Sequence, residues 1–125
     1  MKQNSILLKN VSFKNDIVNV LIEGNKFASL NAPCDSEAAE VVDCSGKALI
    51  PAFYNAHTHA AMTLLRGYAD DLPLYEWLTD YIWPYEATLT PQDITQGSYL
   101  AVLEMIKSGT VFFNDMYWNI EQTVD

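Results

Sequence analysis

Short apolar runs separated by polar breaks fill the first fifty residues, a pattern typical of β-strands joined by turns. The pattern predicts strands at residues 5–13, 17–22, 26–30 and 41–43. Gly24 and Asn25 separate the second run from the third, and because both residue types tolerate positive φ angles, they predict a hairpin turn. We therefore expect residues 1–50 to form an antiparallel β module, a partial β-sandwich.

A continuous apolar run, ALIPAF, begins at residue 48 and changes the pattern. This run over residues 48–53 predicts a strand buried on both faces, as in a parallel sheet. Pro51 donates no ladder hydrogen bond, so it fits best where the strand enters the sheet or lies beside the β module. Residues 110–115, TVFFND, predict a second buried strand.

Two helices are expected between these strands. The first carries apolar residues at helical spacing, namely Leu74, Trp77, Leu78, Tyr81 and Ile82. Pro84 is expected to end this helix. The second helix is expected to begin at Thr90 as N-cap, with Pro91 in its first position, and to end near Ser108 with Gly109 just beyond.

One face of the second predicted helix carries small residues. Its stripe consists of Ile94, Gly97, Ala101 and Met105. Small residues let two backbones approach, so we expect this helix to lie close to a sheet. Residues 119–125 predict the start of a further helix. The order of strand, helices and strand predicts an α/β fold containing a parallel βα unit.

Composition narrows the class of protein. The chain has 125 residues, too few to close an eight-fold βα barrel of about 250 residues. It is 50% hydrophobic and 18% charged, which excludes a disordered chain. Seven basic against sixteen acidic residues argue against nucleic-acid binding. No apolar run approaches the roughly 20 residues of a membrane span, and the first residues lack signal-peptide features, so we expect a cytoplasmic protein without a membrane partner.

Two cysteines, Cys34 and Cys44, are present. They could form a disulfide, contribute half of a metal site or remain ordinary thiols. Because the chain has no Cys-x-x-Cys pair and no secretory signal, we expect free cytosolic thiols.

The only histidines, His57 and His59, are two residues apart. On an extended chain such residues face the same way, with Cα atoms about 6.6 Å apart, so both imidazoles can converge on one ion. Zinc, iron, nickel or manganese would suit this pair. The alternatives are exposed loop histidines or one histidine hydrogen-bonded in the core. A catalytic zinc takes three protein ligands, so further ligands must come from carboxylates or another polypeptide.

Other polar residues give weaker signals. Asp115 ends the second buried strand, where catalytic side chains occur, but we expect it to bond the loop backbone. Asp70 and Asp71 are expected in a solvated loop or helix cap rather than as an acid/base pair. Glu86, taken alone, is expected to be a surface carboxylate after a proline break. Three aromatic residues are expected to pack in a core or lid: Trp77, Tyr81 and Trp83.

Residues 51–67, PAFYNAHTHAAMTLLRG, resemble the first-strand signature of the amidohydrolase superfamily. More narrowly, they resemble the branch that holds 5′-methylthioadenosine/S-adenosylhomocysteine deaminases and s-triazine chlorohydrolases. The resemblance continues through IWPYE at 82–86, LEMIKSGT at 103–110 and DMY at 115–117, and includes VDCSGK at 42–47. Ala52 stands where the family usually has glycine, so the entry to the strand can differ locally.

The resemblance implies an N-terminal fragment of a (β/α)8 TIM barrel, with residues 51–125 as its first two βα units after the β-sandwich module. It implies that His57 and His59 bind the catalytic metal, most commonly zinc, and that Glu86 contacts the ribose hydroxyls of a purine nucleoside. The acid/base residues and remaining ligands are expected beyond residue 125. The implied reaction is deamination of a substrate such as 5′-methylthioadenosine or S-adenosylhomocysteine by metal-activated hydroxide.

Two alternatives remain open. Within enzymes, the protein could be an s-triazine chlorohydrolase or a guanine-type deaminase. In another class, the chain could be a catalytically incomplete fragment, because open sheet edges favour association with itself as a homo-oligomer or with the missing part of the barrel.

Overall fold

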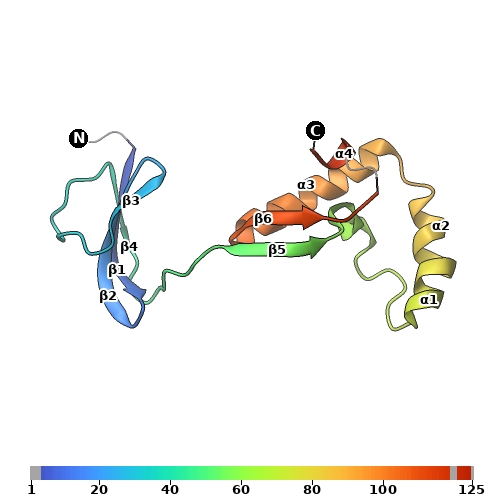
Figure 1. The fold of residues 1–125 in the computed structure, drawn as a ribbon, viewed down its shortest axis with the longest axis horizontal. Helices are drawn as coiled ribbons and strands as arrows, with labels where there is room; N and C mark the ends of the chain where they lie inside the picture. Colours follow the sequence, from blue (N-terminus) through green and yellow to red (C-terminus); the bar gives the residue numbers. More distant parts are fainter. Residues whose placement is uncertain (1–3, 119–120, 125) are drawn as a thin grey trace. The chain divides into compact units, whose positions relative to one another are not determined.

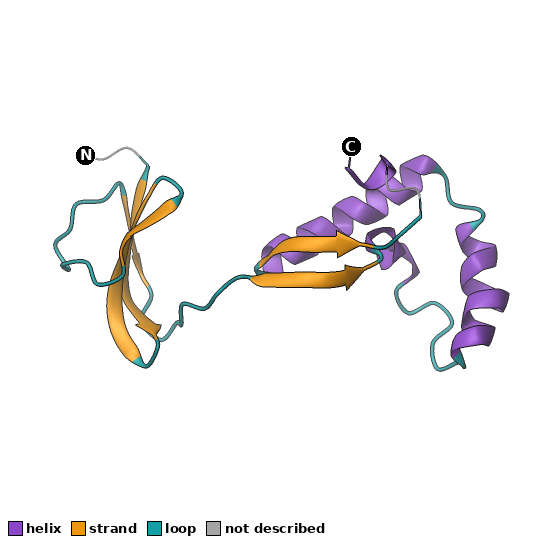
Figure 2. Cartoon of the chain, viewed as in Figure 1, coloured by secondary structure: helices purple, strands orange, loops and turns teal. Residues whose placement is uncertain are grey.

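The computed structural model of the protein describes residues 4–118 and 121–124. Contacts divide the chain into two compact units, Met1–Pro51 and Ala52–Asp125. The first unit is built of strands, and the second of strands and helices (Figure 1, Figure 2). The boundary falls at the proline of the apolar run.

Four strands form one sheet in the first unit, in the order β3-β2-β1-β4. Their bounds are β1 Ser5–Phe13, β2 Asp16–Glu23, β3 Lys26–Ser29 and β4 Glu40–Asp43. All four lie where the hydrophobic pattern predicts strands. β1 with β2 and β2 with β3 pair antiparallel, and Gly24 turns the second hairpin with φ 60°.

β4 departs from the antiparallel arrangement expected for this region. It pairs parallel with β1, with Val41 opposite Leu7. Parallel neighbours need a long connection, and residues 30–39 provide one from the β3 edge of the sheet to the β1 edge. The sheet is therefore mixed, and the prediction of a wholly antiparallel module is wrong at β4.

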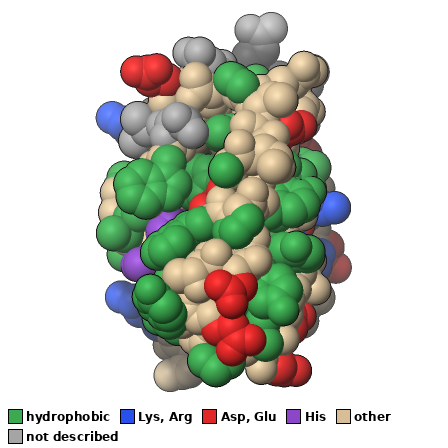
Figure 3. Space-filling model, turned by 90° about the vertical axis from the view of Figure 1, so that its right-hand side faces the viewer, with side chains coloured by type: hydrophobic (Ala, Val, Ile, Leu, Met, Phe, Trp, Pro, Cys, Tyr) green, Lys and Arg blue, Asp and Glu red, His purple; other side chains and the backbone are tan. Residues whose placement is uncertain are grey.

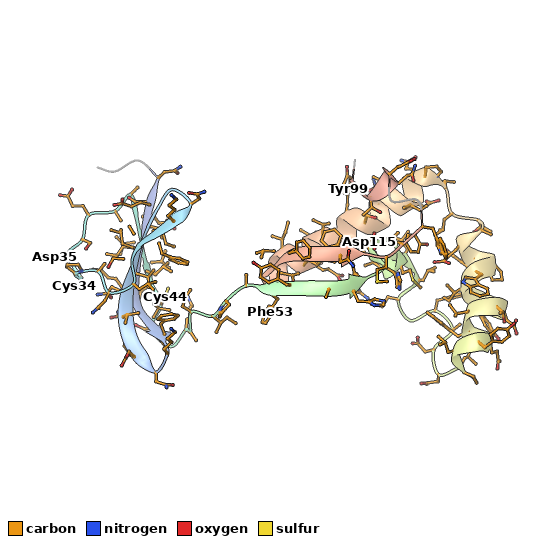
Figure 4. The ribbon with its side chains drawn as sticks, viewed as in Figure 1. Cys34, Asp35, Cys44, Phe53, Tyr99 and Asp115 are labelled. Carbon is orange, nitrogen blue, oxygen red and sulfur yellow. The ribbon has the colours of Figure 1, made fainter. Side chains whose placement is uncertain are left out.

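The core of the first unit gathers around the buried side chains of Val11, Val20 and Cys44. Cys34 lies exposed in the loop between β3 and β4 (Figure 4). Both cysteines are free, so the prediction of two unpaired thiols is confirmed.

The second unit contains a two-stranded parallel sheet of β5, Phe53–Thr58, and β6, Thr110–Asp115 (Figure 1). The parallel βα unit predicted from the order of elements is confirmed. β6 covers the predicted residues, whereas β5 begins at Phe53 rather than at residue 48.

The residues expected to open this strand belong to the first unit instead. The Ser12 amide donates to the Lys47 carbonyl over 2.9 Å, and the Leu49 amide donates to the Ser12 carbonyl over 2.8 Å. Pro51 has no amide proton to offer a ladder, so pairing with β6 starts beyond it. His57 consequently lies inside β5 rather than past its end, and His59 follows just after it.

The first predicted helix continues through its proline. Three segments follow one another, namely α1 Leu74–Glu76, the π-helical η2 Trp77–Ile82 and α2 Trp83–Glu86. Proline lacks an amide proton, and its ring crowds the carbonyl four residues earlier. In the turn before the proline, the Trp83 amide donates to the Leu78 carbonyl five residues earlier. This π turn is wider than an α-helical turn, and the helix continues past Pro84. The prediction that Pro84 ends the helix is therefore wrong, and Glu86 is its last residue.

The second predicted helix is α3, Pro91–Ser108, with the predicted ends. Thr90 and Asp93 form a capping box, in which each side chain accepts from the other's backbone amide. Gly109 closes the helix in the left-handed region with φ 82°, where glycine carries no steric penalty.

α3 lies against η1, the 3₁₀ helix Ala60–Leu65 that follows His59. A Cβ on Gly97 would lie 2.6 Å from the Ala61 carbonyl oxygen, so glycine permits this contact. The Thr63 hydroxyl donates to the Gly97 carbonyl over 2.7 Å. Gly97 thus permits the close approach of η1, and α3 also contacts β6. The helix lies close to the sheet as expected, but its glycine is in contact with η1 rather than with a strand.

The last described element is α4, Glu121–Val124. It begins within the region predicted to start a helix, while Asn119, Ile120 and Asp125 lie outside the described residues. Among the helices of residues 4–118 and 121–124, none is both long enough and apolar enough to cross a membrane.

Candidate functional site

The carboxyl ends of β5 and β6 lie side by side. His57, His59 and Asp115, which the sequence marks as candidates, lie at or next to these ends. Thr58 is the register partner of Asp115, and the Met116 amide donates to the Thr58 carbonyl over 2.9 Å. Figure 4 shows Asp115 at the end of β6. Because parallel strands end at the same edge, the residues that follow both strands meet there.

The two histidines converge as predicted for residues two apart on an extended chain. Their Nε2 atoms lie 3.3 Å apart, and their rings are nearly perpendicular at 88°. Two nitrogens on one tetrahedral zinc, each about 2.0–2.1 Å from it, lie about 3.3–3.4 Å apart. The pair therefore has the separation that a shared zinc requires. Both side chains are exposed, and Figure 3 shows histidine at the surface beside hydrophobic side chains.

The same separation is also compatible with a hydrogen bond between the two rings, depending on the tautomers. Within residues 4–118 and 121–124, no cluster of three or more His, Cys, Asp or Glu side chains could hold a metal. A catalytic zinc takes three protein ligands. The two histidine nitrogens alone are therefore fewer than such a site needs.

Asp115 fixes the turn that follows the histidines. Its Oδ1 accepts a hydrogen bond of 3.0 Å from the Ala60 amide, one residue after His59. This confirms the prediction that Asp115 bonds the loop backbone. Its Oδ2 is buried and has no hydrogen-bond partner among the described residues. A buried unpaired oxygen costs stability, so it marks an acceptor available to a donor group at this edge.

Glu86 and Tyr117 line one cavity at the same edge. Burial and the neighbouring carboxylates of Glu86 and Asp115 raise the pKa of Tyr117 above its ordinary value. Glu86 is half-buried, whereas the proline break alone predicts a surface carboxylate.

A cavity of about 260 Å³ connects these groups. His59, Glu86 and Tyr117 contribute polar atoms to its lining, and three indoles contribute apolar walls: Trp77, Trp83 and Trp118. A wider cavity of about 460 Å³ contains both histidines and shares His59 with the first. A concave, mainly apolar space with a few convergent polar groups is typical of a small-molecule site.

The remaining candidates from the sequence, Asp70, Asp71 and Tyr81, lie in a loop or pack against another ring, as expected. Asp70 and Asp71 lie in an exposed loop, and Asp70 borders the wider cavity. Tyr81 packs its ring 6.3 Å from that of Tyr68. Tyr117 is the residue that sequence reasoning missed. Its position two residues after Asp115 on an extended chain was the available signal, but Glu86, which lines the same cavity, comes from a distant helix.

The family model described as "Amidohydrolase family" matches residues 48–124, which include β5, both histidines, α3 and β6. The chain belongs to the amidohydrolase family. The superfamily resemblance read from the His57–His59 segment is therefore confirmed.

Curated relatives of this amidohydrolase are named as deaminases. A "5-methylthioadenosine/S-adenosylhomocysteine deaminase" of Syntrophomonas wolfei is 60% identical over 88 residues, covering 70% of this chain and 20% of the relative. A protein of the same name from Thermococcus kodakarensis is 47% identical over 127 residues, covering 97% of this chain and 30% of the relative. The chain thus spans less than a third of the length of these relatives.

Solved structures give the same family fold. An adenosine deaminase from Xanthomonas campestris, solved with bound zinc, matches 95% of this chain and 30% of its own at 32% identity and TM-score 0.76. An atrazine chlorohydrolase from Arthrobacter aurescens, complexed with zinc, matches 95% of this chain and 32% of its own at 18% identity and TM-score 0.75. The second likeness, at that identity, is one of fold.

Proposed function

We propose that the protein is a metal-dependent hydrolase that deaminates purine nucleosides, with 5′-methylthioadenosine or S-adenosylhomocysteine as substrate. The observation that carries this proposal is the 3.3 Å separation of the His57 and His59 Nε2 atoms beside the Glu86 cavity. The two curated relatives and the Xanthomonas campestris structure are named as deaminases of adenosine-type compounds, which supports the reaction class.

In this proposal His57 and His59 hold a divalent metal. Zinc fits the nitrogen separation, and iron, nickel and manganese also accept imidazole ligands. When bound, the metal supplies a water whose pKa is lowered toward neutrality, which makes a nucleophile available for hydrolysis. Asp115 holds the backbone after His59 through the Ala60 amide, so it keeps the second imidazole in place. Further ligands and the acid/base groups are expected outside these 125 residues.

Glu86 is proposed to bind the sugar of the substrate. An ionised carboxylate only accepts hydrogen bonds, so it suits the two hydroxyl donors of a ribose. Its cavity has indole walls from Trp77, Trp83 and Trp118, which suit the flat face of a purine. The polar and apolar parts of a nucleoside would thus meet matching surfaces beside His59.

We further propose that β5, β6 and the helices between them form the first two βα units of a (β/α)8 barrel, preceded by part of a β-sandwich. Large side chains on both strands support this architecture because they lack cover within the described residues: Phe53, Tyr54, Val111 and Phe112. Strands buried on both faces are typical of such barrels, whose sites lie at the carboxyl ends of the strands.

The same exposed strands support a second candidate from another class. Tyr54 is 73% exposed and Phe112 is 53% exposed, and their rings lie 5.8 Å apart. Two open strand edges beside an apolar face favour pairing with another chain. On this proposal the 125-residue chain acts by associating with itself or with further barrel segments rather than as a catalyst.

An activity profile tests the leading proposal. The full gene product, loaded with zinc, is assayed for ammonia release from 5′-methylthioadenosine, S-adenosylhomocysteine and guanine, and for chloride release from atrazine. We expect turnover of the two adenosine derivatives, with little or none of guanine and atrazine. Turnover of atrazine or guanine alone would favour the alternative enzyme classes, and no turnover of any substrate would contradict a deaminase.

A further inference from the structure

Tyr68 lies in the loop between η1 and α1, at the border of the candidate site. It lines the cavity of about 460 Å³ that contains both histidines, called here the histidine cavity. Its ring centroid lies 5.3 Å from that of Tyr85 in α2 and 6.3 Å from that of Tyr81 in η2. These separations are typical of favourable aromatic pairs, so the ring of Tyr68 is held against the helical segments.

The backbone beside Tyr68 also has a defined path. The Tyr68 amide donates to the Leu65 carbonyl over 2.9 Å. Ala69 and Asp71 have φ angles of 57° and 63°. Residues other than glycine adopt such angles rarely, and they keep them where the surrounding contacts hold the chain. The loop therefore presents the Tyr68 side chain from a fixed position.

The two cavities of the candidate site would take different parts of a substrate. The Glu86 cavity, of about 260 Å³, and the histidine cavity share His59, Met62 and Trp77. On the proposed function, the sugar lies in the Glu86 cavity and the carbon under attack lies beside the two histidines. The group carried by that carbon would then extend into the rest of the histidine cavity. Among the described residues that line only this cavity, Tyr68 has the largest apolar side chain.

We propose that Tyr68 is a specificity-determining residue whose ring limits the size of the amine carried by the carbon under attack. An unsubstituted amine is accepted, and an N-alkylated amine meets the ring. The inference rests on the proposed deaminase function. Steric exclusion is a common source of specificity, and one carbon more or less in a pocket changes kcat/KM by about 10–200-fold.

The long polar side chain in the same lining is already engaged. The Arg66 guanidinium donates to both carboxylate oxygens of Glu104, over 2.9 and 2.7 Å. This ion pair holds Arg66 toward α3, which carries Glu104. The tyrosine ring is therefore the side chain that we expect to set the boundary.

A purely structural role for Tyr68 makes a different prediction. If its ring only packs the loop against Tyr81 and Tyr85, its removal lowers the activity on all substrates by the same factor. The ratio of kcat/KM for two substrates that differ only at the amine separates the two roles. A gain of activity on the larger substrate cannot come from a loss of structure.

The test compares 5′-methylthioadenosine with its N6-methyl derivative in the zinc-loaded full gene product. Hydrolysis of either consumes one water and breaks the bond from C6 to the exocyclic nitrogen. It gives 5′-methylthioinosine with ammonia or with methylamine, so the common nucleoside product reports on both reactions. We expect the wild type to prefer the unmethylated substrate. We expect Tyr68→Ala to raise the kcat/KM ratio of the N6-methyl derivative to the parent by about tenfold or more.

Two further variants serve as controls. Tyr68→Phe keeps the ring and should retain the wild-type ratio. Tyr75→Ala removes a tyrosine side chain that is 77% exposed on α1, and it should also retain that ratio. An unchanged ratio in Tyr68→Ala, an equal rise in Tyr75→Ala, or equal kcat/KM for both substrates in the wild type would overturn the proposal. If circular dichroism shows that Tyr68→Ala is unfolded, Tyr68→Leu takes its place with the same criteria.

Failure of the deaminase proposal has its own signature. If no variant forms 5′-methylthioinosine, the deaminase proposal fails, and equilibrium binding of the two nucleosides decides the role of Tyr68. Tyr68→Ala must then gain about tenfold in affinity for the N6-methyl derivative relative to the parent, and binding of neither nucleoside overturns both proposals. If the wild type releases ammonia while Tyr68→Ala keeps the wild-type ratio, the deaminase proposal stands and the role of Tyr68 is refuted.

Discussion

At the scale of single residues, the site depends on side chains that meet at the carboxyl ends of two neighbouring strands, β5 and β6. The Nε2 atoms of His57 and His59 are 3.3 Å apart, and Asp115 bonds the Ala60 amide directly after them over 3.0 Å. The position of the second imidazole is thus set partly by a carboxylate on the other strand.

Substitution of Asp115 should therefore weaken metal binding without removing a ligand. In Asp115→Ala the Ala60 amide loses its acceptor and the turn after His59 loosens, so we expect zinc affinity to fall about tenfold, at the lower end of losses for supporting residues in metal sites. Zinc titration by calorimetry checks this. Asp71→Ala, which removes a carboxylate from an exposed loop, should bind zinc like the wild type, and a similar loss there would contradict the specific role of Asp115.

The histidine pair was predictable because its geometry is local, whereas Tyr117 was not. Residues two apart on an extended chain face the same way whatever surrounds them, so the sequence spacing alone brought His57 and His59 together. Tyr117 and Glu86 line the same cavity from the residues after β6 and from the end of α2, and no local pattern brings two such distant segments together.

At the scale of elements, α3 is fixed by its ends. Thr90 donates from its amide over 2.8 Å and from its hydroxyl over 2.6 Å to the Asp93 Oδ2. The hydroxyl and amide of Thr90 hold the pKa of the Asp93 carboxyl below its ordinary value. Because the folded pKa is lower than the unfolded one, ionised Asp93 stabilises the fold above about pH 4 and loses this contribution as pH falls through the folded pKa.

This capping box gives a pH-dependent prediction. Asp93→Asn should reduce the free energy of unfolding at neutral pH, and the difference from the wild type should shrink as the pH falls through the folded pKa of Asp93. Urea denaturation at several pH values measures it, with Asp71→Asn as a carboxylate control in an exposed loop. A difference independent of pH would show that the ionised carboxylate is not what stabilises the cap.

The contact at Gly97 gives a second prediction for α3. In Gly97→Ala the new Cβ would meet the Ala61 carbonyl oxygen at 2.6 Å, and such overpacking costs about 1–3 kcal/mol. Alanine gains about 1 kcal/mol in helix propensity, so we expect a net loss of stability and a lower Tm. Gln96→Ala, on an exposed part of the same helix, should not lower Tm; a higher Tm for Gly97→Ala would contradict the close contact.

Element boundaries were predictable where the signal is local. Thr90, Pro91 and Gly109 act through their own backbone angles and hydrogen bonds, and α3 has the predicted ends. The parallel pairing of β4 and the late start of β5 depend on distant partners, β1 and Ser12, which no local pattern identifies.

At the scale of the whole molecule, many large apolar side chains are left exposed to solvent by the other described residues. Tyr54, Val111 and Phe112 of the β5–β6 sheet are exposed by 73%, 66% and 53%. Exposed apolar patches with open strand edges mark interaction surfaces. The β5–β6 sheet therefore offers an apolar face and open edges to a partner.

The 125-residue chain alone should consequently associate. We expect sedimentation velocity to show species that grow with concentration, and Tyr54→Lys/Phe112→Lys to shift the distribution toward monomer because the patch gains two charges. Ile17→Lys, an exposed apolar residue of β2 in the first unit, controls for added charge. A chain that stays monomeric at all concentrations would contradict association through the exposed β5–β6 sheet.

Metal content and ammonia release, measured together in the full gene product, decide whether the histidine pair holds a catalytic metal. We expect the wild type to bind zinc and to release ammonia from 5′-methylthioadenosine, with the activity abolished by chelation and restored by zinc. We expect His57→Ala/His59→Ala to reduce both metal content and activity to background. A His57→Ala/His59→Ala protein with wild-type metal content and wild-type ammonia release would contradict the proposed metal site.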